Sequence, residues 1–404
     1  MYKKIKISKT NFQREGSFFM KRLFVSICCM LCVCIVPIYC IVMQNDVFAE
    51  TDFKVDAKVG FLMDFSSSEV LFEQNADDKL QIASMAKLMT IFITLEEIDN
   101  NKILLTDKLT TTTNASGMGG SQVFIDPNVQ YTIDDMLKSV VMASANDASV
   151  ALAEHIAGTE ANFVKRMNKK ANELGMKNTL YANSSGLPAP MQYSTARDTA
   201  IILSKILPNK IYQKYSTIWM DELIHPSGRK TELVNTNKLI RYYNGCDSGK
   251  TGSTDEAGYC LSASAIRDNM RLIAVVMGAK TGKERFNQTV KLFNYGFANF
   301  VNEKILCKDE PLSIIKVKKS EIGQTEAYAS ENFYGIVKKG EQSNWEVSTE
   351  IMETIVAPMK SGDEIGNVII SKKGVVIKEI PVILIQDIEV LTFGQSFKKI
   401  VERF

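Results

Sequence analysis

The stretch IASMAKLMTIFITLEEI, residues 82–98, decides how this chain folds. Nearly every position is apolar, which predicts a helix that is buried on most of its sides. Two polar residues near its start, Ser84 and Lys87, are three positions apart. That spacing places both side chains on one face of a helix, one turn from each other. We therefore expect a hydroxyl and an amine to meet at the mouth of a core helix.

A serine and a lysine in this arrangement suit covalent catalysis. At a helix start, the Ser84 hydroxyl lies near free N–H groups that can hold a developing oxyanion. Burial and a nearby second cation both lower the pKa of an amine, so Lys87 could be neutral and take the proton of Ser84. The alternative is a capping serine beside a solvated lysine. Only two histidines, His155 and His225, occur in the chain, which argues against a histidine-built metal site and against a Ser-His-Asp triad.

The segments on either side of this helix predict a sheet flanked by helices. Residues 55–73 read as a hairpin, and residues 259–265 and 270–277 read as adjacent strands. Helical spacing fills residues 132–157, in two stretches, and residues 160–174, and it returns at 286–301. Strands first, helices next, then strands and a closing helix indicate an α+β fold.

A second polar motif, Ser144-Ala145-Asn146, lies in the predicted break between two helices. Such a connection can point into a cleft, where a hydroxyl shuttles a proton and an amide both donates to and accepts from a peptide group. The alternative is an ordinary helix stop, with Asn146 or Asp147 as the N-cap.

A third motif, Lys250-Thr251-Gly252, precedes the predicted strand 259–265. Lys250 and Thr251 could meet a carboxylate by charge and hydroxyl donation, while Gly252 lets a ligand approach the backbone. The alternative is a glycine-rich turn with an exposed lysine. A second Lys-Thr-Gly, at residues 280–282, falls between a strand and a helix and reads as a plain turn.

The C-terminal part of the chain has a different character. Short β-branched segments dominate, which predicts a small all-β domain over residues 303–390; they are residues 313–317, 334–337, 350–358, 368–370 and 375–382. Residues 391–404 then show helical periodicity with one apolar and one charged face, which suits the surface of a membrane. The alternative is a helix packed on its own domain.

The N-terminal 49 residues predict export. Lys21 and Arg22 precede an apolar run over residues 23–43, and Val47-Phe48-Ala49 suits cleavage after Ala49. The alternative is an uncleaved membrane anchor; either way, the rest of the chain lies outside the cytoplasm.

Five of the eight cysteines fall in this segment, so Cys246, Cys260 and Cys307 form no disulfide framework, although Cys246 and Cys260 could pair. A formal net charge of +2 gives no basic field for nucleic acid.

The three motifs in this order resemble those of the serine penicillin-recognising enzymes. Longer stretches are similar to low-molecular-mass D-alanyl-D-alanine carboxypeptidases over about residues 55–300, namely NSSGLP at 183–188, YSTARD at 193–198 and KTGSTDEAGY at 250–259. The resemblance implies a β-lactamase/transpeptidase-like catalytic domain over residues 50–302. Two departures are Ala145, where glycine is common, and Gln192, where histidine often stands.

The resemblance also implies a role for each site residue. Ser84 would be the acylated nucleophile and Lys87 its base, with Ser144 and Asn146 lining the cleft. Binding of the substrate carboxylate would fall to Lys250, Thr251 and Arg285, the last in a loop before the closing helix. Gly252 would keep the strand edge open, and the N–H groups of Ser84 and Ser253 would form the oxyanion hole.

The implied reaction is removal of the terminal D-alanine from peptidoglycan stem peptides through an acyl-enzyme, with β-lactams as inhibitors and no cofactor or metal. The nearest rival is a class A β-lactamase, but residues 144–250 hold no Glu-x-x-Leu-Asn segment for fast deacylation. A second rival is a non-catalytic module that senses wall peptides or penicillin. One assay separates the three: a carboxypeptidase releases D-alanine, a β-lactamase rapidly hydrolyses penicillin, and a sensor does neither.

Overall fold

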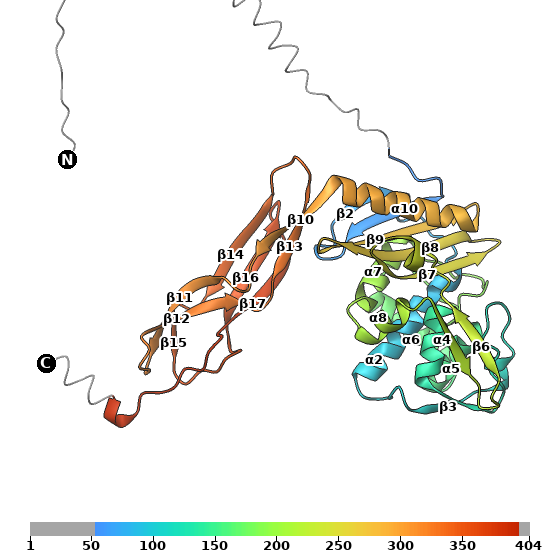
Figure 1. The fold of residues 1–404 in the computed structure, drawn as a ribbon, viewed down its shortest axis with the longest axis horizontal. Coiled ribbons are helices and arrows are strands. Elements are labelled where there is room, and N and C mark those ends of the chain that lie inside the picture. The colour runs from blue at the N-terminus through green and yellow to red at the C-terminus, as the bar shows by residue number, and fades with distance from the viewer. Residues whose placement is uncertain (1–52, 396–404) are drawn as a thin grey trace, which may run out of the picture. The chain divides into compact units, whose positions relative to one another are not determined.

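The computed structural model describes residues 53–395 of the chain (Figure 1). The predicted signal segment, residues 1–49, and residues 396–404 of the predicted C-terminal helix lie outside the described residues. Within residues 53–395, no helix has both the length and the apolar character needed to cross a membrane.

A five-stranded antiparallel sheet forms the centre of the first domain, in the order β2-β1-β9-β8-β7. The strands are β1 (Val59–Asp64), β2 (Val70–Gln74), β7 (Cys246–Thr254), β8 (Gly258–Arg267) and β9 (Met270–Ala279). They confirm the predicted hairpin and the two predicted adjacent strands. The third motif lies in β7, a strand at the edge of this sheet, where one side of its backbone can face a ligand.

Helices cover both faces of this sheet (Figure 1). Neighbouring residues of β1 point to opposite faces: Leu62 lies against Gly296 of α10 (Gly282–Asn299), whereas Phe61 lies under Arg197 of α7 (Ala196–Ile206). The closing helix α10 thus packs on one face, and the helical part of the domain packs on the other. This confirms the predicted α+β architecture.

The predicted core helix is present but begins differently from the prediction. Residues 83–86 form a 3-10 turn, η1 (Ala83–Ala86), and the α-helix α2 (Lys87–Asp99) begins only at Lys87. Ala83 has a φ of +47°, which an α-helix cannot contain. Ser84 therefore lies in the tight turn before the helix rather than in its first turn.

The remaining elements of the first domain complete its helical part, and all of them except α9 contribute to one hydrophobic core with α2. The two helices predicted within residues 132–157 and the helix predicted at 160–174 are confirmed as α4, α5 and α6. The bounds are β3 (Lys108–Thr110), α3 (Thr113–Ser116), β4 (Gln130–Thr132), α4 (Ile133–Met142), α5 (Asn146–Ala157), α6 (Glu160–Glu173), α8 (Lys210–Ser216), β5 (Met220–Ile224), β6 (Lys230–Val234) and α9 (Leu239–Tyr242).

The C-terminal part is all β and has its own core. Two strands pair as β10-β13, and six pair in the order β14-β16-β17-β12-β11-β15. The bounds are β10 (Phe300–Leu306), β11 (Pro311–Lys318), β12 (Gln324–Ala329), β13 (Phe333–Lys338), β14 (Trp345–Ile351), β15 (Thr354–Val356), β16 (Glu364–Lys372) and β17 (Val375–Ile383).

The predicted β-branched segment at residues 350–358 is divided between two strands. The chain leaves β14 at Ile351 and enters β15 at Thr354, and these two strands lie at opposite ends of the six-stranded order. Two residues cannot span a flat sheet of six strands, so the sheet curls until its two ends approach each other. The interruption between β14 and β15 follows from this curvature, which the pattern of apolar residues does not predict.

Candidate functional site

The first two motifs meet at the amine of Lys87. Its Nζ lies 3.1 Å from Ser84 Oγ and 2.5 Å from Asn146 Oδ1, and it also donates to the backbone carbonyl of Ser185. The side chain is completely buried, whereas Ser84 is half-buried. A solvated Lys87 is therefore excluded, and the amine faces the serine hydroxyl as predicted.

The third motif joins the same site through Ser144. Lys250 Nζ lies 2.5 Å from Ser144 Oγ, and Lys250 is only 1% exposed within β7. The alternative of a glycine-rich turn with an exposed lysine is thus wrong. Thr251 is also buried, whereas Ser253, two residues further along β7, is exposed.

The two buried lysines affect each other's protonation. Burial, followed by the charge of Lys250, lowers the pKa of Lys87 well below its ordinary range, while the carboxylate of Asp147 acts in the opposite direction. Burial, followed by the charge of Arg285, lowers the pKa of Lys250 to about 7. The lowered pKa favours the neutral form of the Lys87 amine, and the charge of Lys250 contributes to this effect.

Gly252 brings β7 close to the turn that carries Ser84. A Cβ on Gly252 would lie 2.6 Å from the carbonyl oxygen of Ile82 and 3.2 Å from the backbone nitrogen of Ser84. Only a residue without a side chain allows this contact. The backbone amide of Ser84 and the end of β7 therefore border the same space beside the serine hydroxyl.

The segment with residues 183–188 closes the other side of the turn, and sequence reasoning assigned it no place in the site. Gly186 has a φ of +80°, and a Cβ there would lie 1.9 Å from the carbonyl oxygen of Ala83. Gln192 holds this segment: its Oε1 accepts from the N–H of Ala182 at 3.1 Å, and its Nε2 donates to the carbonyl of Leu187 at 3.0 Å. The stretch NSSGLP at residues 183–188, which resembles the family, was the feature of the sequence that could have placed this segment at the site.

The Asn146 side chain is oriented by a loop that the sequence analysis missed. Its Nδ2 donates to the Gly119 carbonyl at 2.7 Å, and its backbone N–H donates to the Ser121 carbonyl at 2.7 Å. Since the amide nitrogen is bound to the loop, the amide oxygen faces Lys87. Ser144 has a φ of +61°, a strained conformation that aims its hydroxyl at Lys250.

Arg285 lies in α10 and not in the loop before it, so that prediction is corrected. Thr281 caps the helix by accepting from the N–H of Glu284 at 3.1 Å, which starts α10 at Gly282, four residues before the predicted start. Arg285 Nη1 donates to the carbonyl of Gly252 at 3.1 Å. This places its cation beside the third motif. The second Lys-Thr-Gly is the predicted strand-to-helix turn.

The remaining groups of the domain add no metal ligands to this site. Among the described residues, no cluster of histidine, cysteine, aspartate and glutamate could hold a metal ion. Cys246 and Cys260 are buried free thiols, and burial raises the pKa of both. They pair across β7 and β8 with Ala265 and Gly252, respectively, rather than with each other.

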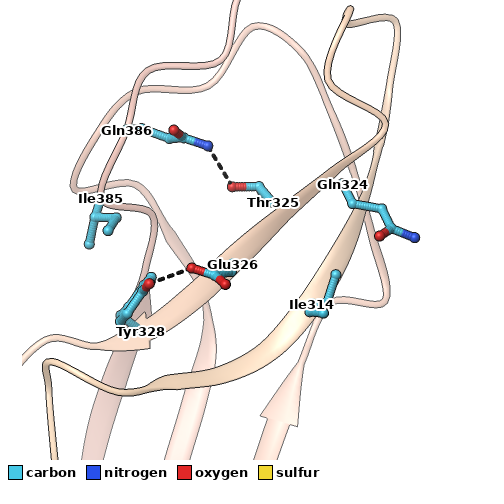
Figure 2. A pocket seen from close by; sticks show the side chains of 7 residues that line it. All are labelled: Ile314, Gln324, Thr325, Glu326, Tyr328, Ile385 and Gln386. Atoms are coloured by element: carbon cyan, nitrogen blue, oxygen red, sulfur yellow. Dashed lines mark hydrogen bonds between the residues drawn. The ribbon is translucent and has the colours of Figure 1, made fainter.

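The β-rich domain carries a separate hollow of about 320 Å³, which no predicted site residue lines (Figure 2). It opens where β12 and the chain after β17 diverge. Glu326 accepts from the Tyr328 hydroxyl at 2.5 Å, and Gln386 donates to Thr325 at 3.1 Å. These polar side chains satisfy one another.

The fold is that of the penicillin-binding proteins. Penicillin binding protein 5 from Haemophilus influenzae is 34% identical, with a TM-score of 0.67 over 84% of this chain and 99% of that one. Penicillin-binding protein D2 from Listeria monocytogenes, solved in its ampicillin-bound form, is 32% identical, with a TM-score of 0.55 over 61% of this chain and 99% of that one.

Residues 45–281 match the family described as D-alanyl-D-alanine carboxypeptidase, and residues 300–390 match the one described as penicillin-binding protein 5, C-terminal domain. The D-alanyl-D-alanine carboxypeptidase DacF of Bacillus subtilis (strain 168) is 41% identical over 346 residues, which are 85% of this chain and 89% of that protein. The chain therefore belongs to the D-alanyl-D-alanine carboxypeptidase family.

Proposed function

We propose that this protein is a serine-type D-alanyl-D-alanine carboxypeptidase that removes the terminal D-alanine from peptidoglycan stem peptides. One observation carries the proposal: the buried amine of Lys87, with its lowered pKa, lies 3.1 Å from the Ser84 hydroxyl. Both side chains border the edge strand that carries Lys250. No histidine is needed, because the neutral lysine serves as the base.

Acylation begins when Ser84 Oγ attacks the carbonyl carbon between the two terminal D-alanines. As the new C–O bond forms, Lys87 takes the hydroxyl proton, and the N–H groups of Ser84 and Ser253 hold the negative oxygen. The C–N bond then breaks. The proton that Lys87 took passes through the Ser144 hydroxyl to the departing amine, and D-alanine leaves.

The terminal carboxylate of the substrate is bound from the β7 side. Lys250 and Arg285 supply positive charge, and the Thr251 hydroxyl donates a hydrogen bond. The negative carboxylate also favours the protonated form of Lys250. Asn146 holds the peptide group of the substrate from the opposite wall, and Gly252 leaves room for the peptide along the strand edge.

Deacylation uses the same base. Water attacks the acyl carbon and Lys87 accepts its proton; the ester C–O bond to Ser84 then breaks, and Lys87 returns the proton to Ser84 Oγ, which regenerates the serine hydroxyl. A β-lactam mimics the substrate up to the acyl-enzyme and should trap Ser84. The reported relatives are D-alanyl-D-alanine carboxypeptidases and penicillin-binding proteins, which favours neither a β-lactamase nor a non-catalytic sensor.

The test uses the mature protein, a fluorescent penicillin and a diacetyl-Lys-D-Ala-D-Ala peptide. We expect the wild type to release D-alanine and to be labelled, and Ser84→Ala to do neither. The matched control is Ser227→Ala, because Ser227 and Lys230 form another Ser-x-x-Lys on an exposed hairpin. Covalent labelling of Ser84→Ala would exclude Ser84 as the nucleophile.

We further propose that the enzyme is exported, with residues 1–49 as its signal segment, and acts at the outer face of the cell membrane. The catalytic domain would span residues 50–302 and the β-rich domain residues 303–390. The amphipathic segment 391–404 would hold the protein on the membrane surface. Deleting residues 392–404 should release active protein into the soluble fraction; a truncated protein that stays on membranes would overturn this role of the segment.

A further inference from the structure

One buried histidine has no part in the proposed reaction. His225 directly follows the strand β5 in the exposed β5–β6 hairpin, yet its side chain is fully buried. Polar groups from two elements surround it: the Tyr131 hydroxyl from β4, and Arg229 and Thr231 from its own hairpin. A buried imidazole with this many partners has a defined protonation state, which the contacts reveal.

The contacts fix which ring nitrogen carries the proton. Arg229 Nη2 lies 3.0 Å from His225 Nδ1, and a guanidinium can only donate. Nδ1 must therefore be the acceptor, and the Tyr131 hydroxyl, at 2.8 Å, shares it. Nε2 then carries the hydrogen and donates to Thr231 Oγ1 at 2.9 Å. Thr231 Oγ1 in turn donates to the carbonyl of Val123 at 3.3 Å.

Val123 belongs to the loop 119–126, which has no regular secondary structure. The hairpin and β4 hold one side of this loop. From the hairpin, Thr231 and Arg229 donate to the carbonyls of Val123 and Phe124, and from β4 the Tyr131 hydroxyl accepts from the N–H of Asp126 at 3.1 Å. Each of the three side chains that hold the loop on this side, Thr231, Arg229 and Tyr131, also contacts His225.

The helix α5 holds the other side of the same loop. The buried carboxylate of Asp147 accepts from the N–H of Val123 at 3.1 Å and from that of Ile125 at 3.2 Å. The carbonyls of Gly119 and Ser121 accept from Asn146. The loop is thus fixed between the hairpin and α5, and its position decides where the Asn146 amide points.

We propose that His225 is a positioning residue for the serine site, which acts through Thr231 and Tyr131 on the loop 119–126 and thereby on Asn146. The inference rests on the proposed function, because it assigns His225 an effect on acylation of Ser84. His225 touches neither the substrate nor the reacting atoms. Its effect is on the geometry of the wall that faces Lys87.

The experiment compares His225→Leu with His225→Gln. Leucine fills the space but can neither accept from Tyr131 and Arg229 nor donate to Thr231, whereas glutamine can do both. We expect His225→Leu to lower the second-order rate of acylation by a fluorescent penicillin on the order of tenfold, because small displacements of positioning groups have large effects on rate. His225→Gln should recover most of the loss. His155→Leu, at the exposed second histidine, should match the wild type.

Amide hydrogen exchange provides a readout that does not depend on activity. The N–H groups of Val123, Ile125 and Asp126 should exchange faster in His225→Leu than in the wild type. Tyr131→Phe removes only the hydroxyl, so it should speed exchange at the N–H of Asp126 alone. A wild type that is never acylated would refute the proposed function, while the exchange data would still test the loop contacts.

Two results would overturn the inference. The first is a folded His225→Leu protein with wild-type acylation and unchanged exchange over residues 119–126. The second is an equal loss in the leucine and glutamine variants, since a merely space-filling role would not distinguish them. The acylation rates and the exchange rates are measured below the melting temperature of each variant, so that unfolding does not enter the comparison.

Discussion

Replacing Gly252 with alanine adds one methyl group where β7 meets the turn that carries Ser84. The new Cβ would lie 2.6 Å from the Ile82 carbonyl oxygen, 3.1 Å from Ala83 Cβ and 3.2 Å from the Ser84 nitrogen. Gly252 has no left-handed backbone conformation to lose. The substitution therefore tests space alone, at the proposed site of oxyanion binding.

The size of the effect follows from these distances. About 0.8 Å separates the 2.6 Å approach to the Ile82 oxygen from the 3.4 Å at which ordinary contact begins, so the turn and the strand must move apart by several tenths of an ångström. Displacements approaching 1 Å can cost about 100-fold in rate. We expect acylation to slow by roughly 10- to 100-fold, or about 1.4–2.7 kcal/mol in the activation free energy. Overpacking should also reduce the free energy of unfolding by about 1–3 kcal/mol.

The assay is the second-order rate of acylation by a fluorescent penicillin, together with D-alanine release from the peptide and denaturant unfolding. Gly323→Ala is the matched control, because its Cβ would meet nothing within 4 Å and its φ is not left-handed. The control should show wild-type rates. A Gly252→Ala protein that is acylated within about twofold of the wild-type rate would refute the reasoning, since that ratio corresponds to only about 0.4 kcal/mol.

Three further predictions concern backbone conformation and protonation. Gly186→Ala, at a φ of +80° and with its Cβ 1.9 Å from the Ala83 carbonyl oxygen, should lower the melting temperature more than Gly252→Ala does; a smaller loss would contradict the geometry. Burial raises the pKa of Asp64 from 3.8 to about 6, so the folded state binds the proton more tightly, and the free energy of unfolding should fall as pH rises from about 4 to about 6, by at most about 3 kcal/mol. Asp64→Asn should remove this slope in urea titrations at pH 4.5 and 7. Lys250→Met removes the cation that lowers the pKa of Lys87, so the acid limb of the acylation rate should move to higher pH, and an unmoved limb would show that burial alone sets this pKa.

The sequence predicted the site better than it predicted the connections around it. Ser84, Lys87, Ser144 and Lys250 could be found because residue type and spacing carry their chemistry: an amine one turn from a hydroxyl, and a polar break between two apolar helices. The structure joins Lys87 to Ser84 and Lys250 to Ser144 by hydrogen bonds, and the charge of Lys250 acts on Lys87. Their roles in catalysis remain proposals that the variants above test.

The parts that sequence reasoning missed depend on contacts between distant segments. The Ser185 carbonyl is a backbone group, and its approach to Lys87 follows from the left-handed turn at Gly186, which no side-chain pattern encodes. The start of α10 was placed too late, because the capping role of Thr281 was read as a turn. The strand break after Ile351 follows from curling of the whole sheet, which local apolar alternation does not report.

The two lysines show why burial can be useful rather than only costly. An isolated buried ammonium is unfavourable, and two that share a site are more so. The lowered pKa of Lys87 favours loss of its proton, which would leave the neutral amine that a general base requires. Lys250 has hydrogen-bond acceptors in Ser144 and the Thr251 carbonyl, and the arriving carboxylate of a substrate favours its charged form. Substrate binding would therefore strengthen the charge on Lys250, and with it the repulsion that keeps Lys87 neutral when Ser84 must lose its proton.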